Sequence, residues 1–106
     1  YSDSPLSDRW TPHPLNPVVK DINSARPAGR IFSHNGNLIR PSQNCSVDYG
    51  YAVMFNRIVD LTETKYSETL EHAFEPPLNS RIIATHTFNS MGGLTAIDAI
   101  RLRRKF

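Results

Sequence analysis

An Asn-Gly pair at positions 35 and 36 constrains the fold of this chain more than any other local feature. It lies between two short apolar runs, Gly29–Phe32 and Asn37–Arg40. Both turn residues tolerate the positive φ angles of a tight primed turn, so Asn-Gly between β-type runs is a strong hairpin signal. The chain then passes a proline and enters a polar loop, Gln43–Ser46. This arrangement predicts an antiparallel β-meander with a decorated loop.

The longest alternating stretch, Tyr49–Leu61, predicts the central strand of the sheet. Every second residue from Tyr49 onward falls on one face, which is almost wholly apolar and rich in β-branched and aromatic types. The following segment, Thr62–Phe74, is ambiguous, because apolar residues four apart would suit an amphipathic helix. We favour a second strand, since a short connection after a long strand usually makes a hairpin.

The two ends of the chain complete the expected organisation. Residues 1–28 hold five of the eight prolines and form a Pro-rich extended lead-in that we expect to pack on the sheet, with one turn at Asp21–Ala25. Near the other end, Arg81–Phe88 predicts a strand, Ser90–Gly93 a turn and Leu94–Leu102 the returning strand. The predicted fold is therefore all-β, with an antiparallel meander of about six strands over residues 29–106.

Length and charge exclude several classes of protein. At 106 residues with 39% hydrophobic residues, the chain is one globular domain or part of one. The net charge is only +2, and a basic cluster confined to residues 101–105 gives little support for nucleic-acid binding. No apolar run reaches the roughly 20 residues of a transmembrane segment, and no signal peptide is visible. The absence of paired cysteines also favours a cytoplasmic location, because Cys45 is the single cysteine.

The chemistry-bearing residues show no catalytic or metal-binding motif. The four histidines have no ligand spacing, so no metal and no cofactor are predicted. The carboxylates Asp48, Asp60 and Asp98 are not paired by spacing, as glycoside chemistry would require. We therefore assign no catalytic residue to this chain.

Several longer motifs together carry a resemblance to a known family. They are Trp10–Val18 (WTPHPLNPV), Ser24–Phe32 (SARPAGRIF), Arg40–Ser46 (RPSQNCS) followed by YGYAV, and Ala84–Asn89 (ATHTFN) followed by GGL. The chain resembles the C-terminal part of the five-bladed β-propeller domain related to glycoside hydrolase families 32 and 43. The likeness is to the version of that domain in glucosamine inositolphosphorylceramide transferases and in bacterial proteins with a formyltransferase-like partner domain.

The resemblance implies a carbohydrate-related binding or structural segment that makes up roughly two blades of such a propeller. In the hydrolase relatives the catalytic carboxylates come mostly from other blades, so whether the chain takes part in an enzyme stays open. One alternative is that it supplies part of the active site of a glycosyl-transfer or glycoside-hydrolase enzyme. Another is a self-assembling β-protein without a ligand. Exposed sheet edges would pair with the remaining blades or with a second copy.

We predict one ligand-binding cluster for a saccharide or glycolipid head group. Sugar recognition uses planar polar groups for hydroxyls and aromatic faces for apolar ring surfaces, and an arginine fork also suits a phosphate or carboxylate. Among the histidines, His86 is chosen because it lies in a family-like motif. The predicted ligand-binding residues are Arg26, Arg40, Gln43, Asn44, Tyr49 and His86.

Overall fold

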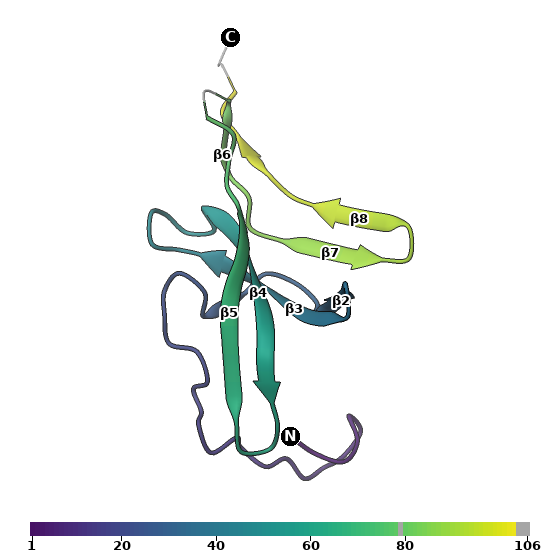
Figure 1. Ribbon diagram of the computed structural model, residues 1–106. Helices are drawn as coiled ribbons and strands as arrows, with labels where there is room; N and C mark the ends of the chain where they lie inside the picture. Colours follow the sequence, from purple (N-terminus) through teal and green to yellow (C-terminus); the bar gives the residue numbers. More distant parts are fainter. Residues whose placement is uncertain (79, 104–106) are drawn as a thin grey trace.

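A computed structural model describes residues 1–78 and 80–103 of the chain (Figure 1). Within those residues the regular structure consists of nine strands in antiparallel pairs and no helix, which confirms the predicted all-β fold. The molecule is elongated, with extents of 55 × 31 × 29 Å. The described part of the chain therefore holds no helix of the length and hydropathy needed to cross a membrane. Arg104 and Lys105 of the basic cluster lie outside the described residues.

The main sheet contains five strands built around a central meander. They are β1 (Arg26–Pro27), β2 (Phe32–His34), β3 (Asn37–Asn44), β4 (Ala52–Leu61) and β5 (Tyr66–Phe74). Strands β3, β4 and β5 pair in sequence, while β1 and β2 both pair with the other side of β3. The predicted hairpin joins β2 to β3, and its two turn residues have φ angles of 49° and 76°. The strand interpretation of the segment after residue 62 is also confirmed, because it forms β5.

Strand β3 is longer than the sequence pattern predicts, because it runs through Pro41 and includes the first part of the expected polar loop. A proline inside a strand removes one donor from the ladder. Here the carbonyl of Pro41 accepts a hydrogen bond from the amide of Ala28 at 3.1 Å, so Pro41 turns its backbone groups toward the gap between β1 and β2. The N–H group that proline lacks would therefore have pointed into this gap, where the ladder is already interrupted.

Strand β4 also departs from the predicted alternation. It begins at Ala52, and bulges interrupt its pairing with β5 between Phe55 and Asn56 and between Ile58 and Asp60. A bulge inserts one unpaired residue, so the residues beyond it change faces. The apolar face predicted for the whole strand therefore ends near the second bulge, and Val59 and Leu61 are exposed. The first half of β4 is instead buried on both faces.

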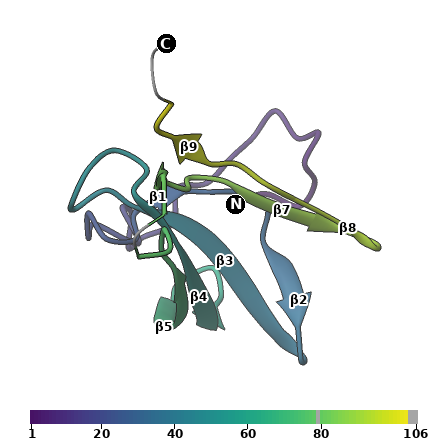
Figure 2. The same ribbon diagram turned by 90° about the horizontal axis from the view of Figure 1, so that it is seen from above.

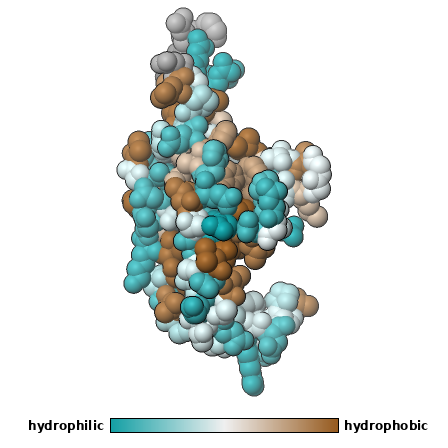
Figure 3. Space-filling model, in the orientation of Figure 1, coloured by the Kyte–Doolittle hydropathy of each residue, from teal (hydrophilic) through white to brown (hydrophobic). Residues whose placement is uncertain are grey.

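The remaining strands form two small pairs beside the main sheet. Strand β6 (Ile82–Ala84) pairs with β9 (Ile100–Arg101), and β7 (Phe88–Met91) pairs with β8 (Leu94–Ile97). The single strand predicted over residues 81–88 is thus divided in two. The turn predicted over Ser90–Gly93 contains only Gly92 and Gly93, because β7 continues to Met91. Figure 2 shows the β7–β8 hairpin as a separate layer, and Figure 3 shows a hollow between this hairpin and the projecting start of the lead-in.

Aromatic side chains join the β7–β8 hairpin to one face of the main sheet. The ring of Phe88 lies 5.4 Å from that of Phe32 and 5.0 Å from that of Phe55, measured between centroids. The amide of Phe88 also donates to the carbonyl of Ala28 at 2.8 Å. These contacts leave Phe32, Phe55 and Phe88 half-buried between the hairpin and the sheet.

The lead-in lies along the opposite face of the sheet and along the β4–β5 turn (Figure 1). His13 Nε2 lies 3.0 Å from the carbonyl oxygen of Thr62. The predicted turn forms, with the amides of Ser24 and Ala25 donating to the carbonyl of Asp21. Trp10, in contrast, is exposed.

Candidate functional site

Segments that are far apart in the sequence meet around His86, between β6 and β7. The amide of Thr85 donates to the carbonyl of Tyr51 at 3.1 Å, which places residues 85–87 beside the loop that precedes β4. Gly50 has a φ of +61°, and a Cβ built on it would lie 2.5 Å from the Cβ of His86. Only glycine therefore allows the backbone at residue 50 to pass so close to His86.

His86 is held by Asp98, which follows β8. Asp98 Oδ1 accepts hydrogen bonds from the amides of His86 at 3.0 Å and Thr87 at 2.8 Å. Its other oxygen also contacts the buried Nδ1 of His86, without the alignment of a hydrogen bond. Burial raises the pKa of Asp98, but the two backbone amides outweigh it and leave the pKa below its ordinary value. About 33% of the His86 side chain remains exposed, so the ring presents its other atoms to solvent.

The same two amides explain why the predicted strand divides in two. A backbone amide that donates to a side-chain oxygen is withdrawn from the sheet ladder. His86 accordingly lies in the break between two strands, where the sequence pattern placed it within one. The contact between Asp98 and His86 is not among the sequence-based predictions. Its signal lies in the predicted hairpin, because the observed register pairs Phe88 with Ile97 and so brings Asp98 opposite Thr87, next to His86.

Arg26 and Tyr49 lie next to His86. The guanidinium carbon of Arg26 is 4.6 Å from the centroid of the Tyr49 ring, a cation–π contact, and that ring lies 6.4 Å from the His86 imidazole. Tyr49 is 56% exposed. Among the described residues, no side chain or carbonyl accepts a hydrogen bond from the Arg26 guanidinium. Arg26, Tyr49 and His86 form what we call the Arg26 cluster. It offers the exposed cationic donors of Arg26 beside the aromatic face of Tyr49.

Gln43 and Asn44 lie at the same end of β3 but use their polar atoms within the protein. Gln43 is buried, and its Nε2 donates to the carbonyl of Pro27 at 3.2 Å. The Oδ1 atom of Asn44 accepts hydrogen bonds from the amide and hydroxyl of Ser46. These two residues therefore shape the strand and the loop beside the Arg26 cluster.

The structure places Arg40 on the opposite face of the sheet from Gln43, because residues three apart on a strand point to opposite sides. Its guanidinium makes two hydrogen bonds to the Glu68 carboxylate, at 2.7 and 2.6 Å, and one to the carbonyl of Ser24 at 2.7 Å. The Arg40 and Glu68 side chains are only 13% and 12% exposed. Arg40 is thus separated from the other predicted ligand-binding residues and ties the lead-in to the sheet.

Tyr66 completes this ion pair by donating its hydroxyl to Glu68 Oε2 at 2.5 Å. Burial raises the pKa of Glu68, but the hydrogen bonds from Arg40 and Tyr66 outweigh it and leave the pKa below its ordinary value. Burial, followed by the bond to Glu68, raises the pKa of Tyr66 to about 12. The carboxylate is therefore ionised and the phenol neutral at neutral pH.

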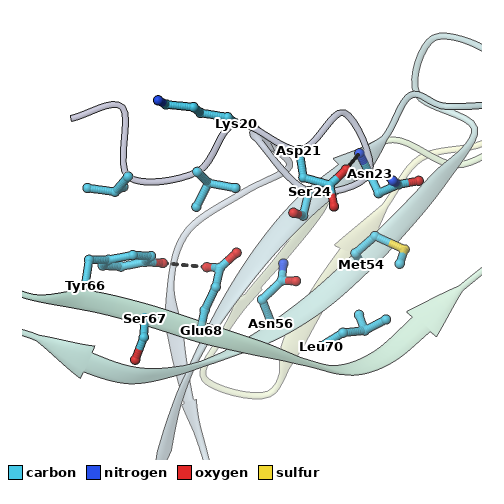
Figure 4. A pocket seen from close by; sticks show the side chains of 12 residues that line it. Lys20, Asp21, Asn23, Ser24, Met54, Asn56, Tyr66, Ser67, Glu68 and Leu70 are labelled. Atoms are coloured by element: carbon cyan, nitrogen blue, oxygen red, sulfur yellow. Dashed lines mark hydrogen bonds between the residues drawn. The ribbon is translucent and has the colours of Figure 1, made fainter. Parts of the chain in front are cut away.

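A pocket of about 470 Å³ opens above this ion pair, between the lead-in and strands β4 and β5 (Figure 4). Sequence reasoning missed it, because its walls come from segments about 30 to 50 residues apart. Among the described residues, no group of three or more His, Cys, Asp or Glu side chains could hold a metal ion. The pocket is lined by Val18, Val19, Lys20, Asp21, Asn23, Ser24, Met54, Asn56, Tyr66, Ser67, Glu68 and Leu70.

Comparisons with protein families and with individual proteins point to the same kind of protein. Residues 1–89 match the family described as glucosamine inositolphosphorylceramide transferase 1, N-terminal. The chain is 43% identical over 70 residues to the glucosamine inositolphosphorylceramide transferase 1 of Oryza sativa subsp. indica and 39% identical over 70 residues to that of Arabidopsis thaliana. Each match covers 64% of this chain and 9% of the relative, so the matched region is a small part of those proteins. No solved structure matches the chain.

Proposed function

The chain belongs to the family of the N-terminal region of glucosamine inositolphosphorylceramide transferase 1, and on this basis we propose that it is a binding segment of a glycosyltransferase-associated protein. Its ligand is the head group of a phosphate-bearing saccharide or glycolipid. The names of the relatives contain both a sugar and an inositol phosphate, which fits such a ligand.

The observation that carries this proposal is the grouping of Arg26, Tyr49 and His86 on one exposed surface. The Arg26 guanidinium lies over the Tyr49 ring and keeps its donors available, as phosphate recognition requires. The exposed ring of Tyr49 offers an apolar face to a sugar. Asp98 orients the imidazole of His86 beside them.

The three aspartates singled out from the sequence, Asp48, Asp60 and Asp98, support binding rather than catalysis by this chain. Asp48 Oδ1 accepts a hydrogen bond from the amide of Tyr49 at 2.7 Å, and Asp60 Oδ2 accepts one from the hydroxyl of Ser67 at 2.5 Å. Asp98 holds two backbone amides. Each of the three is thus engaged in a local structural contact, and the acid–base chemistry of glycoside hydrolysis needs two carboxylates across one sugar.

A propeller blade is the architecture we propose for the main sheet. Strands β2, β3, β4 and β5 are four consecutive antiparallel strands, the arrangement of one blade, and the β6–β9 region would begin the next. Strand β5 has no partner on its outer side among the described residues, which suits pairing or stacking with further blades. Measurement of the solution mass separates this arrangement from self-assembly of several copies.

Titration with myo-inositol 1-phosphate, followed by two-dimensional amide NMR, tests the binding proposal. We expect the amides of Arg26, Tyr49 and His86 to shift, and the Arg26→Gln variant to bind at least fivefold more weakly. Arg9→Gln is the matched control, since it removes the same charge from an exposed site in the lead-in. An equal loss in both variants, or no shift at these amides, would refute the proposed ligand site.

A further inference from the structure

The wall of the pocket below the lead-in carries an amide side chain, Asn56, whose oxygen has no donor among the described residues. Asn56 is only 3% exposed, and its Nδ2 donates to the carbonyl of Arg40 at 3.1 Å and to Ser42 Oγ at 2.7 Å. No described residue donates a hydrogen bond to its Oδ1. Figure 4 shows this side chain rising from β4 into the pocket. The Asn56 side chain is nearly buried, but its Oδ1 lines the pocket, where it can accept a hydrogen bond from a ligand.

The opposite wall presents a second acceptor. Asp21 Oδ1 accepts hydrogen bonds from the amide of Asn23 at 2.9 Å and from its side-chain Nδ2 at 2.7 Å, while no described residue donates to Oδ2. These bonds lower the pKa of Asp21, so the carboxylate is ionised at neutral pH. In Figure 4 Asp21 and Ser24 hang from the lead-in toward the sheet, whereas Lys20 extends away from Asn56.

The floor of the pocket is polar without an available cation. Both Glu68 oxygens are occupied by Arg40 and Tyr66, so the ion pair neutralises itself. The Tyr66 hydroxyl donates a hydrogen bond to Glu68, and its oxygen can still accept one. On the other side of the floor, Met54 and Leu70 provide an apolar surface.

We propose that this pocket binds an uncharged cyclic polyol, such as the hydroxylated ring of a monosaccharide or an inositol. The available polar atoms of Asn56, Asp21 and Tyr66 are acceptors, so they select a ligand rich in hydroxyl donors. Met54 and Leu70 would contact the C–H face of the ring. The ionised Asp21 disfavours a phosphate, and the volume of about 470 Å³ is within the usual range for a small-molecule site.

This site is separate from the Arg26 cluster. Asn56 pairs with Arg40 and therefore shares its face of the sheet, whereas Arg26 pairs with Gln43 on the other face. The two surfaces also differ in chemistry, because one offers acceptors and the other offers cationic donors. Either can therefore bind its ligand when the other does not.

The test is amide NMR of the protein with myo-inositol and, separately, with inorganic phosphate. We expect myo-inositol to shift the amides of Asn23, Ser24 and Asn56, and inorganic phosphate to leave them in place. Asp21→Ala should weaken binding at least fivefold, with Asp8→Ala in the same lead-in as the control. Leu70→Trp, which adds bulk at a half-exposed edge of the pocket, should abolish binding, whereas Leu94→Trp on exposed β8 should not.

Absence of shifts at these amides up to high millimolar myo-inositol would overturn the proposal. Equal losses in the Asp21 and Asp8 variants, or shifts of the same size with phosphate, would also overturn it. Shifts at Arg26, Tyr49 and His86 belong to the other face and report on the proposed head-group site. Failure of one proposal is therefore distinguishable from failure of the other.

Discussion

Substitution of Gly50 by alanine tests whether close packing at residue 50 holds the His86 segment in place. Gly50 and Gly36 both have φ angles in the left-handed region, +61° and +76°. A Cβ at Gly36 meets nothing within 4 Å, whereas one at Gly50 would lie 2.5 Å from the Cβ of His86. The pair therefore separates the backbone cost from the packing cost, with Gly36→Ala as the control.

The expected magnitudes follow from these contacts. An alanine in the left-handed region costs about 1–2 kcal/mol at either position. At Gly50 the added methyl group must also displace His86, and overpacking of this kind costs a further 1–3 kcal/mol or so. His86 cannot move aside easily, because Asp98 holds its amide and the neighbouring Thr85 amide bonds to Tyr51. Gly50→Ala should thus lower the free energy of unfolding by about 2–5 kcal/mol.

Urea denaturation of the two variants and the unsubstituted protein measures this difference. Thermal unfolding should agree, with Gly50→Ala melting at least about 4 °C below Gly36→Ala, since each kcal/mol shifts the midpoint of a domain of this size by roughly 4–8 °C. The amide resonances of residues 85–87 should move in Gly50→Ala alone. Equal destabilisation in both variants would refute the reasoning, because it would leave only the backbone term.

Two further predictions concern the ion pair and Asp98. Glu68→Gln leaves the Arg40 guanidinium without its charged partner and should lower the free energy of unfolding by about 2–4 kcal/mol in urea denaturation. Folding lowers the pKa of Glu68 from its ordinary value, so its contribution is present above that ordinary value and is lost as the pH falls through the folded pKa. The acid-induced loss of stability should therefore be smaller in the variant, and identical pH profiles would contradict the assignment. Asp98→Ala removes the acceptor of two backbone amides and should cost about 1–3 kcal/mol, with faster hydrogen exchange at residues 86 and 87. Unchanged exchange at those amides would show that Asp98 does not hold them.

The sequence predicted the parts of the fold that depend on local chemistry. Asn35 and Gly36 form the expected turn because few other residues accept positive φ angles. The β-branched and aromatic residues of β4 form a strand, and the segment after it forms β5 through a short connection. Three of the six predicted ligand-binding residues, Arg26, Tyr49 and His86, lie together.

Other features depended on contacts between distant segments. The bulges in β4 and β5 change which residues share a face, and no local pattern marks them. Strand β3 accommodates Pro41 because, on the side away from β4, its ladder is interrupted between β1 and β2. The positions of β1 and β2 follow from the tertiary structure.

The amino-acid sequence by itself determined the all-β class and the hairpins, because turn chemistry and alternation act between neighbouring residues. The tertiary structure alone decided that Arg40 binds Glu68 on one face while Arg26 lies over Tyr49 on the other. It also decided that Asn56 and Asp21 face one pocket. The physical reason is that each of these contacts joins residues from different strands or from the lead-in. Their proximity depends on how the whole chain packs.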